Sequence, residues 1–218
     1  MAKSTPRMSA AARKQQIAEV TLDLIGRYGL QGTTMSRIAA NVGITQAALY
    51  THFDSRHDIL LAALDVMYER IYADREALIT ENSLDTLRRI CEHHREFWAG
   101  KRDRHNYQLL LGFIGAAPSE GLQEAMAEKH MGTVRQLAQV VEKGKEEGKI
   151  PAHVDPDHVA WLITGWALGG DVCDLIGLTA LVEPKLATYW HSAILDEMFK
   201  GFANGAIATE ADGDGAQT

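Results

Sequence analysis

The side chains best suited to chemistry lie between residues 33 and 56, where hydroxyl, amide and basic groups are interleaved with apolar ones. Gln46, Thr51 and Arg56 carry the donors and acceptors that base edges and phosphates require. The chain contains no HExxH zinc motif, no Gly-rich phosphate loop and no GxSxG nucleophile motif. These residue types indicate recognition of nucleic acid. An enzyme whose catalytic groups come together only on folding stays a remote alternative.

Two short helices joined by a tight turn must position these groups. Thr33 or Thr34 can cap a first helix, in which apolar residues recur at three- and four-residue steps. Gly43 supplies the left-handed residue that ends this helix, and Thr45 can cap the second one. The pattern predicts helix, turn and helix within about twenty residues.

The second helix is expected to have one buried face. Leu49 and Phe53 lie four residues apart and therefore share the inward side. The side chains left pointing elsewhere, and so able to face a DNA groove, are those of Gln46, Ala47, Tyr50 and Thr51.

This stretch resembles the DNA-binding segment of the tetracycline-repressor (TetR) family, most closely over residues 10–60. Three positions depart from the family pattern: Ala47 replaces a common Gly, Arg56 a common Lys and His57 a frequent Glu. The resemblance implies an all-α chain of about nine helices, with an N-terminal three-helix helix-turn-helix domain and then a helical ligand-binding and dimerisation domain. The matching residues are Thr34, Ile38, Ala39, Gly43, Ile44, Thr45, Leu49, Tyr50, Phe53, Ser55 and Arg56.

The DNA-contacting residues divide by the chemistry of their side chains. Gln46 is predicted to contact a base edge, because a side-chain amide can pair with adenine. Thr45, Ala47 and Ala48 offer small polar or methyl contacts in the same groove. The residues predicted to bind phosphates, and so to set register and affinity, are Thr34, Arg37, Tyr50, His52 and Arg56.

The charge distribution favours DNA binding at the N-terminal end, although the whole chain has a net charge of -7. Residues 1–57 hold seven Lys or Arg and three Asp or Glu, a net charge of +4. The remainder holds 15 basic and 26 acidic residues, a net charge of -11. Phosphates should therefore attract the first segment and repel the second.

The predicted organisation is a DNA-binding domain over 1–56, a helical domain over 57–204 and a disordered tail over 205–218. Within the first domain, an arm covers 1–8 and the motif covers 33–53. Pro118, the 148–151 stretch and Pro184 are expected to separate helices. Outside the motif, the predicted helices are 9–28, 55–79, 83–99, 105–116, 119–147, 156–178 and 184–203.

Cysteine spacing and hydropathy predict a cytoplasmic chain without contact to a membrane. No window holds about 18 consecutive apolar residues, and the N-terminal segment lacks an apolar signal core. Cys91 and Cys173 are far apart, so a disulfide framework is not expected. Cys91 and His94 can share a helix face but have no third partner at suitable spacing, so neither a metal site nor a cofactor is predicted.

The resemblance also implies a ligand cavity and a dimer interface in the second domain. The cavity is expected to take a small, largely apolar or aromatic effector. The alternative is that its aromatic and Met residues simply fill the core, which such residues do more often than they form ligand sites. The predicted cavity residues are Trp98, Tyr107, Phe113, Met126 and Trp166. The predicted homodimer interface uses the last two helices, through Gly165, Gly169, Trp190, Ile194 and Met198.

The sequence thus predicts a DNA-binding transcriptional regulator and not an enzyme. It is expected to bind a near-palindromic, double-stranded operator as a dimer, most simply as a repressor that a small ligand releases. A regulator without small-ligand control, whether architectural, controlled by another protein or an activator, is the alternative that the residues leave open.

Overall fold

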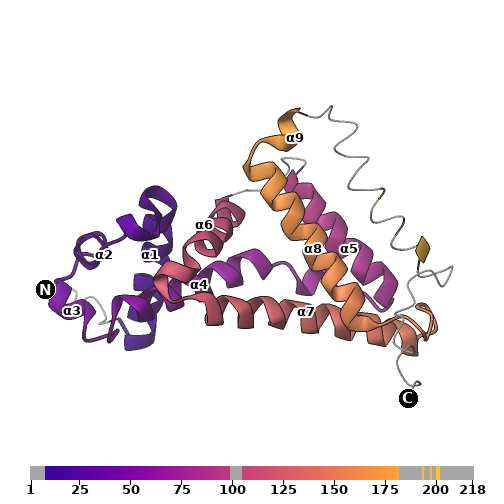
Figure 1. Ribbon diagram of the computed structural model, residues 1–218. Coiled ribbons are helices and arrows are strands. Elements are labelled where there is room, and N and C mark those ends of the chain that lie inside the picture. The colour runs from indigo at the N-terminus through magenta and orange to yellow at the C-terminus, as the bar shows by residue number, and fades with distance from the viewer. Residues whose placement is uncertain (1–7, 99–104, 182–192, 194–196, 198–199, 202–218) are drawn as a thin grey trace, which may run out of the picture. The chain divides into compact units, whose positions relative to one another are not determined.

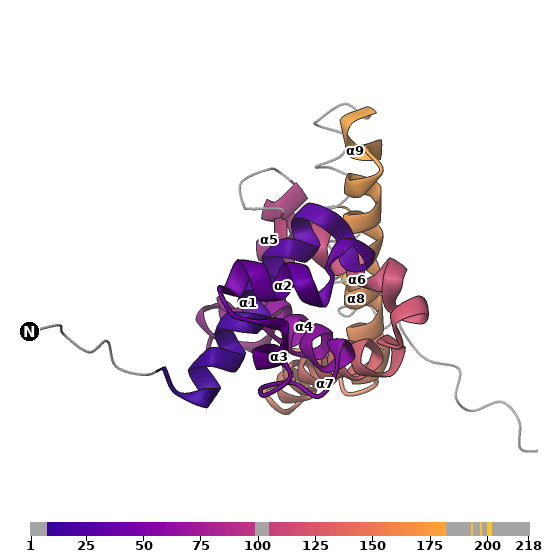
Figure 2. The ribbon, with the colours of Figure 1, turned by 90° about the vertical axis from the view of Figure 1, so that its left-hand side faces the viewer.

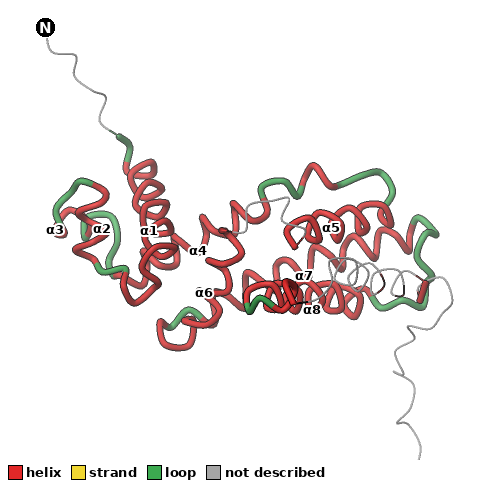
Figure 3. The backbone as a smooth tube through the Cα atoms, turned by 90° about the horizontal axis from the view of Figure 1, so that it is seen from above, coloured by secondary structure: helices red, strands yellow, loops and turns green. Residues whose placement is uncertain are grey.

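The computed structural model describes residues 8–98 and 105–181, together with positions 193, 197, 200 and 201. Side chains at 97, 98, 106, 107, 179 and 180 lie outside this description. Helices joined by loops make up the described chain, and it contains no strand (Figure 3). The prediction of an all-α fold is confirmed.

The described residues divide into two compact units. One unit takes the described residues within Met1–Ala73 and Arg104–Lys129, and the other takes those within Asp74–Asp103 and His130–Thr218. The first unit therefore contains the helix over His105–Glu120 as well as the N-terminal helices. Division by contacts thus breaks the chain after Ala73 and not at residue 57. The predicted division by function, 1–56 and 57–204, remains a prediction.

The first unit is built around its longest N-terminal helices. Helix α1, Ala10–Gly32, packs against α4, Arg56–Tyr72, and both pack against α6, His105–Glu120 (Figure 1). Fully buried side chains such as Leu22, Leu60 and Phe113 fill the space between these three helices. This core supports the short helices α2, Met35–Val42, and α3, Gln46–Leu49.

Two boundaries in the first unit differ from the prediction. Helix α4 ends at Tyr72 and not near residue 79, because its buried apolar stripe ends at Ile71 and the next three residues after Tyr72 are not buried. Helix α6 continues through Pro118 instead of ending before it. Proline has no amide hydrogen, so the Ile114 carbonyl, four residues before Pro118, has no donor within the helix. Ile114 lies on an exposed side of α6, where water can donate to this carbonyl.

The second unit contains a short 3-10 helix, Glu76–Leu78, helix α5, Ser83–Trp98, most of α7, Gln123–Glu146, helix α8, Pro156–Leu175, and α9, Leu178–Leu181. Its core is lined by apolar side chains of α5, α7 and α8. Asp155 caps α8 through the Asp157 and His158 amides, as the Asp-Pro pair predicts. Helix α9 was not predicted, and the predicted helix over 184–203 lies largely outside the described residues.

Helix α5 begins with a cap that involves two distant parts of the second unit. The Asn82 side-chain oxygen accepts from the Leu84 and Asp85 amides, so Asn82 is the capping residue. The Glu147 carboxylate accepts from the Ser83 amide and hydroxyl, each at 3.0 Å. These bonds lower the pKa of Glu147, the amide bond being the largest cause.

No helix within the described ranges combines the length and apolar character needed to cross a membrane.

Candidate nucleic-acid interface

Helix α2 is fixed by a cap at its start and by apolar contacts along one face. The Thr34 hydroxyl accepts from the Arg37 amide, so Thr34 and not Thr33 is the capping residue. Ile38 is fully buried, and the same side of α2 carries Met35, Ala39 and Val42, all of them buried. The opposite side of the helix is left to solvent.

The turn after α2 has the geometry that its glycine predicts. Gly43 adopts φ 76° and ψ 34°, the left-handed conformation that ends a helix and that a side chain would strain. The Ile44 amide then donates to the Ala39 carbonyl at 3.0 Å, and the Thr45 hydroxyl accepts from the Ala48 amide at 3.1 Å. Two caps and one left-handed residue thus set the angle between α2 and α3.

Helix α3 is a single turn held by a buried anchor. Leu49 is fully buried, Phe53 is nearly so, and the Phe53 amide donates to the Leu49 carbonyl at 3.0 Å. Hydrogen-bonded turns therefore continue the chain beyond the helix, which is shorter than predicted. The side chains of Thr45, Gln46, Ala47, Tyr50 and Thr51 are exposed, and those of Ala48 and His52 are half-buried. Figure 2 shows the ribbon from the side on which α1, α2 and α3 face the viewer.

Gln46 is oriented by Ser36, a partner ten residues away that helical spacing does not predict. The Ser36 hydroxyl on α2 donates to the Gln46 side-chain oxygen at 3.0 Å. An amide oxygen has two lone pairs, so it can still accept from adenine while the amide nitrogen donates to the same base. The signal in the sequence was a hydroxyl residue on the solvent side of α2, but its distance from Gln46 depends on the turn.

Arg37, predicted to bind phosphate, is held by two neighbours at the end of α1. Its guanidinium lies 4.1 Å from the centre of the Tyr28 ring and donates to the Gly32 carbonyl. Stacking on an aromatic face suits the planar guanidinium, which keeps other N–H groups for a further acceptor. Arg37 therefore ties α2 to α1, and a phosphate contact stays a prediction.

Arg56 occupies a more enclosed position than its predicted phosphate role requires. Its guanidinium donates to the Leu30 carbonyl at 2.5 Å and to the Thr33 carbonyl at 3.2 Å, and it pairs with the Glu120 carboxylate. The Arg56 and Glu120 side chains keep 29% and 14% of their exposure. The residue thus joins the start of α4 to the α1–α2 turn and to the end of α6, and a phosphate contact would require some of these bonds to break.

Another cation lies beside the motif on α1. The Lys14 ammonium lies 5.3 Å from the centre of the Phe53 ring, which brings positive charge next to the chain that follows α3. The predicted arm, apart from Met8, lies outside the described residues. Of the described basic residues, Lys14 thus adds positive charge beside the end of the motif.

Three of the five predicted cavity residues have described side chains, and these belong to the cores of both units. Phe113 and Met126 are buried in the core of the first unit. Trp166 packs against the core of the second unit, and the side chains of Trp98 and Tyr107 lie outside the description. Their role as ligand contacts stays a prediction.

The predicted dimer residues are described only in part. Gly165 and Gly169 lie exposed on α8, and the same helix exposes the apolar side chains of Trp161, Leu162 and Val172. The remaining three predicted residues, Trp190, Ile194 and Met198, lie outside the described part of the chain.

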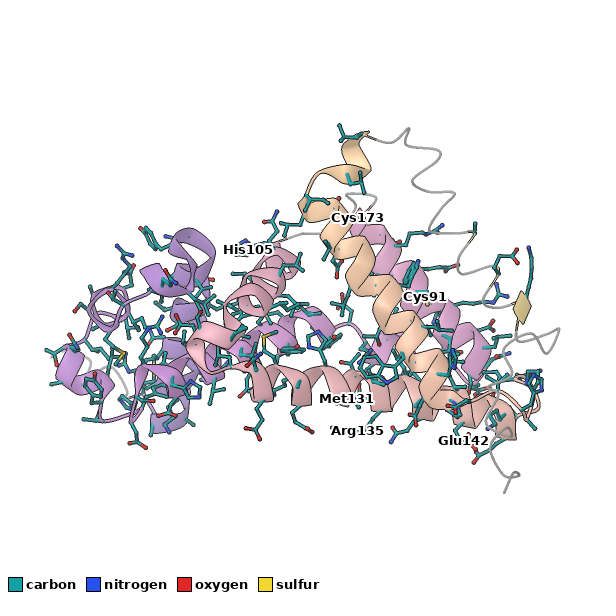
Figure 4. All side chains as sticks on the ribbon, viewed as in Figure 1. Cys91, His105, Met131, Arg135, Glu142 and Cys173 are labelled. Carbon is teal, nitrogen blue, oxygen red and sulfur yellow. The ribbon has the colours of Figure 1, made fainter. Side chains whose placement is uncertain are left out.

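Helices α5 and α8 of the second unit carry the two cysteines and a His–Asp pair. Cys91 lies on α5 and Cys173 on α8, both as free thiols (Figure 4). Burial is the main cause that raises the pKa of Cys91 to about 12. His94 pairs with Asp171 at 3.2 Å beside the Trp166 ring. Within the described residues, no group of three potential metal ligands occurs.

Comparison with known proteins agrees with the geometry of the motif. Residues 17–63 match the family described as bacterial regulatory proteins, tetR family. The transcriptional regulator TtgR of Pseudomonas putida is 25% identical over 181 residues, which cover 77% of this chain and 86% of TtgR.

Solved structures extend the similarity in fold to most of the chain. A TetR transcription regulator from Haloarcula marismortui is similar with a TM-score of 0.71 and 21% identity, over 86% of this chain and 98% of that one. The regulator FadR of Bacillus subtilis, in complex with stearoyl-CoA, is similar with a TM-score of 0.59 and 17% identity, over 85% and 97% of the two chains.

Proposed function

Because the chain belongs to the TetR family of transcriptional regulators, we propose that it represses transcription by binding a near-palindromic operator as a homodimer. A small molecule then releases it from the operator. The family is one of DNA-binding regulators and not of enzymes. The observation that carries the proposal is the exposed face of α3, where a capped, anchored helical turn presents Gln46, Ala47 and Tyr50 to solvent.

Each group on this face has a role that follows from its chemistry. Gln46, oriented by Ser36, reads adenine in the major groove, and Ala47 contacts a thymine methyl group. Thr34, Tyr50 and the half-buried His52 bind phosphates and fix the register, with Arg37 as a further candidate. Thr45, Ala48 and Thr51 complete the surface that enters the groove.

Dimerisation supplies the second half of the operator contact. Two copies of α3 can enter successive major grooves when a two-fold axis places them about 34 Å apart. The exposed apolar side chains of α8, with Gly165 and Gly169 among them, offer a surface whose burial would stabilise a dimer. A helical partner can approach closely at such glycines because they lack side chains.

Control by a ligand rests on family likeness and on the composition of the second unit. FadR, which shares this fold, was solved with stearoyl-CoA, a ligand with a long apolar chain. Trp166 and the His94–Asp171 pair place one aromatic and two polar groups together beside the apolar core of the second unit, so an effector bound there would meet both kinds of group. An effector must bind the DNA-incompetent conformation more tightly to cause release.

Selection from a random duplex library tests DNA recognition directly. The purified protein is incubated with the library, bound duplexes are amplified and sequenced, and the best site is titrated at two salt concentrations. Enrichment of a palindrome supports a dimeric, sequence-specific regulator. Salt-dependent binding without enrichment would refute the operator proposal.

A thermal-shift screen then tests ligand control separately. A compound that binds only the folded protein raises the unfolding midpoint as its concentration rises. Such a compound should also weaken operator binding, because linkage between the two sites is reciprocal. Tight binding that leaves operator affinity unchanged would instead favour a regulator without small-ligand control.

A further inference from the structure

A pocket of about 520 Å³ lies between α1 and α6 within the first unit. Its walls come from the last turns of α1, including Tyr28 and Leu30, and from one side of α6, including Gln108 and Leu109. The two helices pack against each other in the structure, and His105 lies at the start of α6 (Figure 4). The volume falls within the range of small-molecule sites in proteins.

Two glycines of α6 keep this pocket open. A side chain built at Gly112 or Gly115 would meet no atom within 4 Å, so these glycines do not serve close packing of helices. Both lie inside α6, where glycine destabilises a helix relative to alanine. The other glycines of the lining have different reasons: Gly26 lets His105 approach, and Gly29 has a positive φ.

The polar groups of the pocket lie toward its ends. On α6, Gln108 and Ser119 share the face that carries the two glycines, one on either side of them. Gln31 adds a second amide from the end of α1. The Ser119 hydroxyl donates to the Ala116 carbonyl at 3.0 Å, which leaves its oxygen able to accept a bond from a ligand.

The lining selects against charge in a ligand. The described residues of the lining include no Lys, Arg, Asp or Glu; its one titratable ring nitrogen pair belongs to His105, and the Arg37 guanidinium outside the lining stacks on the Tyr28 ring. A charged group within the lining would therefore give up hydration without a Lys, Arg, Asp or Glu of the lining beside it, whereas neutral groups can bond to the amides. The His105 ring, the leucine side chains and the face of the Tyr28 ring that Arg37 does not cover provide surfaces against which an aromatic ring can pack.

From these features we infer that the pocket between α1 and α6 binds an uncharged, aromatic small molecule. This site uses the ends of α1 and α6 and none of the residues proposed for the effector cavity or for DNA contact. Its existence does not depend on the proposed function, since binding can be measured without DNA.

A matched pair of fluorescent probes tests the inference. N-phenyl-1-naphthylamine is uncharged, and 8-anilinonaphthalene-1-sulfonate has the same ring skeleton with a negative charge. Both become brighter in apolar surroundings, so each is titrated with the full-length protein. We expect saturable binding of the neutral probe and at least tenfold weaker binding of the sulfonate at this site.

Substitutions that fill the pocket locate the bound probe. Gly112→Leu and Gly115→Leu should each weaken binding of the neutral probe at least tenfold, with Gly115→Ala intermediate. Gly132→Leu is the matched control, because Gly132 lies on α7 outside the lining and also has open space for a side chain. Circular dichroism and the unfolding midpoint confirm that each variant folds.

The same titrations can overturn the inference. If both leucine variants fold and bind the neutral probe as the unchanged protein does, the probe lies elsewhere and the pocket is not its site. If the sulfonate binds as tightly as the neutral probe and is displaced by the same leucine substitutions, the pocket does not select against charge.

Discussion

Replacement of Glu120 by Gln tests whether Arg56 stabilises the folded protein or binds a DNA phosphate. In the structure the Arg56 guanidinium pairs with the Glu120 carboxylate and also bonds to two carbonyls at the end of α1. The Glu120→Gln change removes the charge of the partner and retains its shape. We expect a loss of stability and no loss of any phosphate contact, because Glu120 itself would repel phosphate.

The size of the effect follows from the burial of the pair. Exposed ion pairs contribute about 0–1 kcal/mol, and breaking a fully buried one costs about 3–5 kcal/mol. Arg56 and Glu120 keep 29% and 14% of their exposure, and the two carbonyls still hold the guanidinium. We therefore expect a loss of about 1.5 kcal/mol, which lowers the unfolding midpoint by about 3–6 °C for a chain of this length.

A double-mutant cycle with Arg56→Gln isolates the pair. Each single variant and the double variant are unfolded by denaturant, and the coupling free energy between the two positions should be about 1 kcal/mol or more. The matched control is the Arg70–Asp23 pair, which lies in the same unit at 3.5 Å but keeps 36% and 54% of its side-chain exposure. Its coupling should lie at the lower end of the range for exposed pairs.

Operator binding at several salt concentrations decides the question. Loss of a phosphate contact flattens the dependence of log K on log salt by about 0.9 for each contact. If Arg56 only joins helices within the protein and binds no phosphate, Arg56→Gln and Glu120→Gln should leave this slope unchanged. A flatter slope for Arg56→Gln alone, with no coupling in stability, would refute the reasoning and restore the phosphate role.

Three further predictions concern single side chains. Ser36→Ala should weaken operator binding about 2- to 10-fold, because it removes a hydrogen bond worth about 0.5–1.5 kcal/mol. Gln46→Ala should weaken binding too and should also relax the base preference at one operator position in a binding selection. If Gln46→Ala weakened binding to all operators equally, the base contact would be contradicted. Glu147→Gln should lower the unfolding midpoint at pH 7, because it removes the carboxylate charge that the Ser83 bonds favour. The pKa of Glu147 in the folded protein lies below its usual 4.5, so the difference in midpoint between the variant and the unchanged protein should vanish as the pH falls through that lowered pKa. A difference that persists under more acidic conditions would rule out the charge as its cause. Labelling with a thiol reagent at about pH 8 should modify Cys173 and spare Cys91, because burial raises the pKa of the Cys91 thiol to about 12. The control variant Cys91→Ser should be labelled to the same extent as the unchanged protein. Two rapidly labelled thiols per chain would contradict this prediction.

The sequence alone determined the helix-turn-helix geometry, because caps and turns depend on neighbours within a few positions. Thr34 and Thr45 cap helices through amides three residues away, and Gly43 ends α2 through its own left-handed conformation. The buried anchors Leu49 and Phe53 follow from helical spacing. Local chemistry therefore sufficed to predict which side of α3 faces solvent.

Tertiary structure alone decided which distant groups meet. Glu120 pairs with Arg56 across 64 residues, and Glu147 reaches Ser83 across the same separation. The pocket beside Gly112 likewise exists only where α1 and α6 pack together. Spacing along one helix fixes a side chain's direction, but its partner depends on how separate helices pack, and that is set by the summed burial of many apolar side chains.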